Sequence, residues 1–245
     1  MKHRIIPALI ILVIAIAACS KVPITNRKQM NLVPEASINS AALAQYQEFI
    51  KDNPPVAATD QNAILVKNTG AKVSRAVIQF LSQNKMSNRV AGYKWEFNLV
   101  NEKEANAWCM PGGKVVVYSG LLPITKDENG LAFVMGHEIA HAVARHGNER
   151  LSQMLLAQTG SIALDVALAN KPAETRQMIG TAYAVGANYG VLLPYSRTHE
   201  SEADKLGLVF MAMAGYDPRL APEVWKRMAA LGGKKPPRSE EHTSE

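Results

Sequence analysis

The chain has 245 residues, of which 47% are hydrophobic, so it is long enough to form one domain with a substantial core. Its formal net charge of +6 comes from 27 Lys and Arg against 21 Asp and Glu, and these charges are spread along the chain. The lack of a basic patch in the sequence excludes a nucleic-acid-binding protein.

Residues 1–18 have the composition of an export signal. A basic start precedes an apolar run that is too short for a comfortable membrane span and ends in small residues. With Cys19, its last residues read Ile-Ala-Ala-Cys and resemble the bacterial lipobox, in which the cysteine is lipidated and becomes the new N-terminus. We therefore expect a lipoprotein signal peptide over residues 1–18 and a lipid on Cys19. The alternatives are a plain signal peptide and an uncleaved anchor.

Lipidation of Cys19 would tie the protein to a membrane of the bacterial cell envelope. Ser20 follows it, and by analogy with sorting in Gram-negative envelopes a residue other than aspartate favours the outer membrane, facing the periplasm. Cys109 would then be the only other cysteine, which rules out an intramolecular disulfide. Because it lies between Trp108 and Met110, we expect Cys109 to be a small core hydrophobe.

The mature chain is predicted to begin with a tether and a helix over residues 19–57. Residues 20–35 are polar and irregular in pattern, and apolar residues at helical spacing follow over residues 36–51. Two prolines, at positions 54 and 55, end that helix.

A second helix is predicted over residues 61–81, and a small sheet follows it. Trp95, Phe97 and Leu99 alternate with polar residues, which is the period of two that a half-buried strand shows. Residues 114–118 are rich in β-branched side chains and follow a Gly-Gly turn, which predicts another strand.

Helices dominate the remainder of the chain. Thr125 and Glu128 fit a capping box and Gly147 fits a C-terminal stop, so one helix is predicted between them. Further helices are predicted over residues 148–169, 172–192, 196–215 and from 218 to about 231. The predicted fold class is α+β, predominantly helical, with a small sheet.

The helix after Thr125 carries the pattern His-Glu-Ile-Ala-His at residues 137–141. His137 and His141 lie one turn apart on one face, so both imidazoles can reach one metal ion, and Glu138 can take a proton from a water molecule that the metal activates. Apart from the histidines, Glu138 is the only charged residue over positions 130–144, which predicts a buried helix. Buried imidazoles need partners, and a metal would supply one. The alternative is a pair of core histidines hydrogen-bonded to backbone.

Catalytic zinc usually takes three protein ligands, so a third is needed. The metzincin class requires glycine at 144 and histidine at 147, where this chain has Ala144 and Gly147, so that class is excluded. His146 is rotated away from the shared face and is interpreted as a helix-end histidine.

The best candidate for the third ligand is Glu200. Glu200 and Asp204 are four residues apart and share a helix face, so one can bind metal while the other accepts the N–H of a ligating histidine. Glu202 points elsewhere and is expected to face solvent. The alternative for the pair is a solvated charged face.

Five segments of the chain resemble one family of proteases. They are Asn-Ala-Trp-Cys-Met-Pro-Gly-Gly at 106–113, Ser-Gly-Leu-Leu at 119–122, the segment 136–141, Ala-Arg-His-Gly at 144–147 and the segment 200–204. In this order they resemble the membrane-associated zinc metallopeptidases that include HtpX, BepA, the mitochondrial Oma proteases and the CAAX prenyl endopeptidases. The resemblance covers residues 58–231 and is nearest to the BepA and Oma type, because no multi-span region is visible.

This resemblance implies a zincin-like metallopeptidase domain over residues 58–237, with the small sheet beside the active-site helix. It makes His137, His141 and Glu200 the ligands of one Zn²⁺ per chain, Glu138 the general base, and Asp204 the partner that orients a ligating histidine. It also implies that residues 106–118 pair with an extended substrate as an added strand.

The function that follows is zinc-dependent hydrolysis of peptide bonds in misfolded or surplus cell-envelope proteins. Its partners are polypeptide substrates and, through the lipid anchor, a membrane, while the oligomeric state is not predicted. An alternative is a metal-binding envelope chaperone or quality-control module with little or no proteolytic activity, against which Glu138 argues. A third hypothesis is a structural lipoprotein without metal.

The end of the chain departs from the family pattern. Relatives generally continue past the last helix with a His-Pro element and a later arginine, whereas residues 238–245 read Arg-Ser-Glu-Glu-His-Thr-Ser-Glu. One reading frame of a common sequencing-adapter oligonucleotide encodes the same octapeptide. We therefore expect residues 238–245 to be a non-native tail and the natural C-terminus to be truncated.

Overall fold

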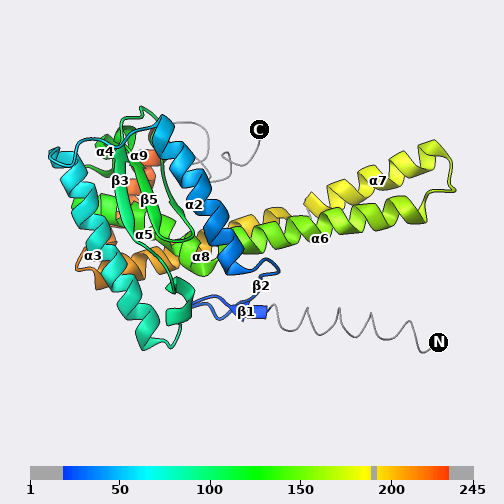
Figure 1. The fold of residues 1–245 in the computed structure, drawn as a ribbon, viewed down its shortest axis with the longest axis horizontal. Helices are drawn as coiled ribbons and strands as arrows, with labels where there is room; N and C mark the ends of the chain where they lie inside the picture. Colours follow the sequence, from blue (N-terminus) through cyan, green and yellow to red (C-terminus); the bar gives the residue numbers. More distant parts are fainter. Residues whose placement is uncertain (1–18, 189–191, 232–245) are drawn as a thin grey trace. The chain divides into compact units, whose positions relative to one another are not determined.

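The computed structural model describes residues 19–188 and 192–231 (Figure 1). The signal peptide expected over residues 1–18 and the tail expected over residues 238–245 lie outside this range. The chain divides into two compact units, one made of the residues up to 35 together with 145–201, and the other of residues 36–144 together with the residues from 202 on. No helix in the described ranges is both long and apolar enough to span a membrane.

A three-stranded sheet forms the centre of the second unit. Its strands are β3 (Glu96–Val100), β4 (Ala107–Met110) and β5 (Lys114–Tyr118), in the order β3-β5-β4. β5 is parallel to β3 and antiparallel to β4. The strand predicted over residues 114–118 is confirmed, while the pattern of β4 was too short to be predicted as a strand.

The two edges of this sheet differ. Beside β3, Pro55 forms a bridge with Val100, and the amide of Val56 donates to the carbonyl of Leu99. β4 forms the other edge, and within the described ranges β5 is its only strand partner. Within those ranges no strand pairs with the outer edge of β4.

Helices cover both faces of the sheet. α2 (Glu35–Asp52) contributes Tyr46 to a buried cluster with Val100, Trp108, Val116 and Tyr118 on one face. On the other face lie α3 (Gln61–Gln83) and α5 (Glu128–Ala144), where Phe97 and Met135 pack against Gly70 so closely that a Cβ there would collide with both. The expected α+β architecture, predominantly helical with a small sheet, is confirmed.

The start of α5 differs from the prediction. The side chain of Asp127, rather than that of Thr125, accepts a hydrogen bond from the amide of Gly130 at 2.9 Å. Thr125 ends a short helix, α4 (Leu122–Thr125), which follows the 3₁₀ turn η3 (Ser119–Leu121). The capping box is wrong because Lys126 adopts φ 66° and separates the two helices.

The end of α5 also differs from the prediction. The stop predicted at Gly147 is wrong, because the chain turns two residues earlier, at Arg145, which has the left-handed φ of 62°. α6 (His146–Ala167) begins directly afterwards, so His146 starts a helix and does not end one.

The first unit contains a hairpin where an irregular tether was expected. β1 (Cys19–Lys21) pairs antiparallel with β2 (Lys28–Met30), and Val22 beside them is fully buried. α6 holds the segment that follows β2, since the Asn148 side chain donates to the carbonyl of Val33 at 2.8 Å and the Ser152 hydroxyl accepts from the amide of Leu32 at 2.8 Å. The side chain of Cys19 lies outside what the structure describes.

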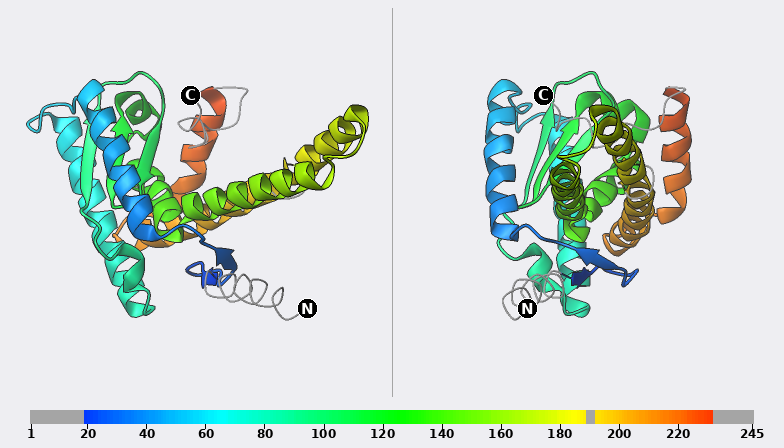
Figure 2. Two further views of the ribbon diagram at one scale, coloured as in Figure 1. Left: turned by 45° about the vertical axis from the view of Figure 1, so that its right-hand side comes forward. Right: turned by 90° about the vertical axis from the view of Figure 1, so that its right-hand side faces the viewer.

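α6 and α7 (Ala173–Ala187) lie side by side as a helical hairpin (Figure 2). Tyr183 links them by donating to the carbonyl of Ala157 at 2.9 Å. α7 begins one residue after the start of the helix predicted over residues 172–192, and residues 189–191 of that prediction lie outside the described ranges. Two helices alone cannot enclose their apolar side chains, and Val166 is 73% exposed.

α8 (Leu193–Met213) follows, and then the 3₁₀ turn η5 (Pro218–Leu220) and α9 (Ala221–Leu231). α8 begins three residues before the predicted Ser196, with Pro194 in its first turn, where proline is tolerated. Within the second unit, α8 crosses α5 at Gly207 and Gly136. A Cβ on Gly207 would lie 2.9 Å from the backbone nitrogen of His137, so only glycine permits this approach.

Glu149 of α6 anchors the first unit electrostatically. Its side chain is almost fully buried, at 2% exposure, and is paired with Arg27 and His199. Burial raises the pKa of Glu149, but the hydrogen bonds from Arg27 and His199 outweigh burial and lower the pKa from 4.5 to about 2.

Replacement of Gly207 by alanine should lower the free energy of unfolding by about 1–3 kcal/mol, because the backbone at His137 must move to admit the methyl group. Urea unfolding followed by circular dichroism measures this change. Gly180→Ala in α7 is the matched control, since a Cβ there meets nothing within 4 Å and should raise helix stability by up to about 1 kcal/mol. Equal effects of the two substitutions would contradict the tight crossing.

Acid should remove the stabilising effect of Glu149. Because its folded pKa of about 2 lies below the ordinary 4.5, ionisation of the carboxyl stabilises the fold by about 3 kcal/mol relative to the protonated form above pH 4.5, and this contribution is lost as the pH falls toward 2. Unfolding curves of the wild type and Glu149→Gln should differ at neutral pH and converge below pH 4.5. A difference that does not vary with pH would argue against the ion pair.

Candidate metal centre

The motif helix α5 is buried on almost all sides, as its sequence predicts. Between Gly130 and Ala144 the residues are buried apart from Glu138 and His141, which are partly exposed. Glu138 and His141, one turn apart, therefore mark the one partly exposed face of this stretch.

His137 and His141 direct the same ring nitrogen toward each other. Their Nε2 atoms are 3.1 Å apart, and the ring centroids are 4.8 Å apart. Because the residues are one turn apart on a helix, this arrangement follows from the local sequence. It leaves both Nε2 atoms able to share one cation.

Asp204 of α8 holds the other nitrogen of His137. Its Oδ1 lies 2.9 Å from His137 Nδ1, and the His137 side chain is only 7% exposed. A carboxylate accepts from Nδ1–H, which leaves the Nε2 of His137 with a lone pair for a metal. The structure thus places Asp204 at the ring nitrogen of His137 that does not face His141.

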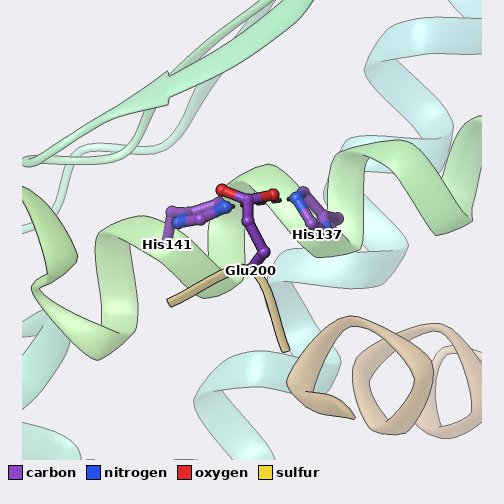
Figure 3. A group of neighbouring side chains, drawn as sticks. All are labelled: His137, His141 and Glu200. Atoms are coloured by element: carbon purple, nitrogen blue, oxygen red, sulfur yellow. Dashed lines mark hydrogen bonds between the residues drawn. The ribbon is translucent and has the colours of Figure 1, made fainter. Parts of the chain in front are cut away.

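Glu200 lies one turn before Asp204 in the same helix. The ligand atoms of His137, His141 and Glu200 lie within 4.8 Å of one another. Figure 3 shows the Glu200 carboxylate between the two imidazole rings, with all three side chains directed at the same region. The two carboxylates of α8 therefore face different atoms, Asp204 toward Nδ1 and Glu200 toward the Nε2 pair.

This set of donors fits zinc. Two imidazole nitrogens and one carboxylate oxygen are the ligands of many catalytic zinc sites, with distances of about 2.0–2.2 Å from the ion. Ligand atoms around one such ion are about 3.4 Å apart, which is close to the 3.1 Å between the two Nε2 atoms. Since the set contains three protein donors, a fourth position would remain for water or substrate.

An apolar wall that the sequence did not predict encloses His137. The Trp225 ring of α9 meets the His137 ring edge-on at 5.6 Å between centroids, and Phe133 lies against both rings. α9 is held in place by Arg227, whose guanidinium donates to the carbonyls of Ile124 and Thr125. Trp225 is far from the motif in sequence, and only its helical spacing with Val224 and Ala221 marked it as part of a packed face.

Glu138 lies on the side of α5 that faces β4. Burial raises the pKa of the Cys109 thiol strongly, and the negative charge of Glu138 raises it further, which requires the two side chains to be near each other. Cys109 is therefore a protonated, unreactive thiol, as expected for a small hydrophobic residue. The edge strand β4 thus runs beside the candidate base.

Glu202 and His146 lie elsewhere than the metal-ligand group. Glu202 was expected to face solvent, but it is 3% exposed, so that prediction is wrong. Its position between Glu200 and Asp204 turns it toward the protein interior because successive helix positions differ by about 100°. His146 does not join the metal-ligand group, and it stacks on His199 within the first unit.

Comparison with known proteins identifies the family of this chain. The family model of peptidase family M48 matches residues 69–244. The chain is 36% identical over 212 residues to the mitochondrial metalloendopeptidase OMA1 of Schizosaccharomyces pombe, a match that covers 86% of this chain and 58% of that protein.

Two other relatives match shorter regions. The mitochondrial metalloendopeptidase OMA1 of Arabidopsis thaliana is 39% identical over 147 residues, covering 60% of this chain and 28% of the relative. The beta-barrel assembly-enhancing protease of Yersinia pestis is 32% identical over 142 residues, covering 55% of this chain and 28% of the relative. The chain therefore spans little more than half of the longest-matched relative and about a quarter of the other two. With a family model that covers most of its length, this chain belongs to peptidase family M48.

Proposed function

We propose that this chain is a zinc-dependent endopeptidase. The observation that carries the proposal is the pair of Nε2 atoms 3.1 Å apart, with Asp204 on the remaining nitrogen of His137 and the Glu200 carboxylate beside the pair. In this proposal His137, His141 and Glu200 hold one Zn²⁺ per chain. When bound, zinc supplies a Lewis acid that polarises a peptide carbonyl and acidifies water.

Glu138 is the general base of the proposed reaction. It follows His137 directly, lies on the partly exposed face of α5, and is near enough to β4 to affect the Cys109 thiol. In that position its carboxylate takes a proton from the attacking water and then delivers it to the leaving amine. The apolar wall of Trp225 and Phe133 keeps bulk water from one side of His137, which strengthens the hydrogen bond to Asp204.

The substrate of the proposed enzyme is an extended polypeptide. The outer edge of β4 offers backbone donors and acceptors beside α5, so a peptide can add to the sheet as a strand next to Glu138. Recognition through the main chain places few demands on side chains. Such an enzyme would suit misfolded or surplus proteins of varied sequence.

The proposed location is the bacterial cell envelope, with a lipid on Cys19 and the catalytic domain, residues 58–237, in the periplasm. The lipobox-like residues before Cys19 support this location, and one relative is named a beta-barrel assembly-enhancing protease. A lipid anchor at the mature N-terminus would precede the β1–β2 hairpin directly.

Loss of the carboxylate at position 204 should weaken zinc binding. We expect Asp204→Ala to raise the dissociation constant for zinc by about 10–100-fold, because the His137 ring loses the acceptor that orients it. Asp204→Asn keeps an acceptor oxygen and should cause a smaller loss. Competition with a chromophoric chelator measures both constants, and wild-type affinity in Asp204→Ala would contradict the role of this residue.

Removal of the base should abolish catalysis without removing the metal. Glu138→Gln should lower the rate of casein hydrolysis by about 10²–10⁴-fold at equal zinc content, because glutamine cannot accept the proton. Removal of zinc by a chelator should abolish casein hydrolysis by the wild type, and added zinc should restore the rate. Hydrolysis by Glu138→Gln at the wild-type rate would refute Glu138 as the base, and an absence of hydrolysis in both proteins would refute the peptidase and leave a metal-binding chaperone as the function.

A further inference from the structure

A buried network of polar side chains in the first unit has no part in the proposed reaction. Its centre is Glu149, which accepts hydrogen bonds from both terminal nitrogens of Arg27 at 2.7 Å. Gln29 of β2 donates to the same carboxylate at 3.3 Å, and the ring nitrogen Nε2 of His199 lies 2.9 Å from it. Three elements therefore meet at one carboxylate: the N-terminal hairpin, α6 and α8.

His199 is fixed on a second side by a stacked imidazole. The rings of His146 and His199 are nearly parallel, 12° apart, with 4.3 Å between centroids. Both residues are buried, at 4% and 7% exposure. Stacking sets the plane of the His199 ring, and the hydrogen bond to Glu149 sets its direction within that plane.

Arg27 also contacts α8 one turn earlier. Its guanidinium carbon lies 5.6 Å from the ring centroid of Tyr195, within the range of a cation–π contact. Tyr195 and His199 are four residues apart and lie on one face of α8. The network therefore holds α8 at two successive turns, which fixes both its rotation and its position along its axis.

Glu200 follows His199 directly. One residue along a helix corresponds to a rotation of about 100° and a rise of about 1.5 Å, so a rigid contact at His199 determines where the Glu200 carboxylate points. We infer that Arg27, Glu149 and His199 are positioning residues for the metal ligand Glu200. This inference rests on the proposed function, since it takes Glu200 as a ligand.

Stability alone is a poor reason for such a network. Buried ion pairs contribute little net stability compared with apolar residues of the same size, because removing the charges from water costs as much as the pair regains. A bidentate pair with a stacked histidine does define one geometry, since each hydrogen bond has a fixed direction. The N-terminal hairpin thereby helps to fix the direction of Glu200, within the first unit.

Zinc affinity of purified full-length variants tests this inference. Competition with a chromophoric zinc chelator gives the dissociation constant for the wild type, Arg27→Met, His199→Phe and His199→Gln. We expect Arg27→Met and His199→Phe to weaken zinc binding by about tenfold or more, because Glu200 is no longer held in place. His199→Gln, whose amide can donate to Glu149, should return the affinity to within about threefold of the wild type.

The matched control is Lys28→Met, which removes a positive charge from the exposed neighbour of Arg27 and should leave zinc affinity unchanged. Circular dichroism establishes that each variant is folded. If Arg27→Met does not fold, Arg27→Met combined with Glu149→Gln replaces it, since this pair leaves no buried charge unpaired. The same tenfold weakening is expected of the pair.

The outcomes separate the inference from the proposed function. A wild type that binds no zinc refutes the metal centre and the inference with it. Folded Arg27→Met and His199→Phe variants with wild-type zinc affinity refute the positioning role alone. Weakened binding in His199→Phe that His199→Gln does not restore also overturns it, because the hydrogen bond to Glu149 would then be irrelevant.

Discussion

The close crossing of α5 and α8 is the constraint on which the candidate site depends. Gly136 and Gly207 meet backbone to backbone, and a Cβ at 207 would lie 2.9 Å from the nitrogen of His137. A larger side chain at this contact would push the two helices apart and lengthen the contact between Asp204 and the Nδ1 of His137. Two missing side chains thus permit the 2.9 Å contact that orients the imidazole. The orientation of His137 therefore depends on Gly136 and Gly207, which have no reactive side chain.

Two kinds of contact orient the His137 ring, a hydrogen bond and packing against aromatic rings. Asp204 fixes which nitrogen carries the proton, while Trp225 and Phe133 limit rotation of the ring by contact. Arg227 helps to hold Trp225 in place by tying α9 to the carbonyls that end α4. The last helix is therefore part of the site through packing, although it supplies no metal ligand.

Local patterns in the sequence predicted much of this structure, and contacts distant in sequence account for what they did not. The buried helix around His137 and the β-branched strand over residues 114–118 follow from composition and period, which neighbouring residues determine. The break at Arg145 could not be predicted, because a non-glycine residue in the left-handed region is favoured only by the packing on either side of it. Glu202 was predicted to be exposed because the sequence does not reveal which face of α8 is covered by other elements. The sequence indicated Glu200 as a ligand only through its spacing from Asp204 and through the family resemblance, because position 200 lies 59 positions after His141 and no local period connects the two.

The helix α8 must be held in register for either of its carboxylates to function. A slip of one residue would rotate Glu200 and Asp204 together by about 100° and shift them by about 1.5 Å, so that both would lose their partners at once. The glycine crossing restrains α8 at Gly207, and the network of Arg27 and Glu149 restrains it at Tyr195 and His199. Both carboxylates lie between these two points of contact, where neither a rotation nor a translation of the helix can occur without breaking one of them. The positions of the side chains in the candidate metal centre consequently depend on a salt bridge and a pair of glycines as well as on the motif residues.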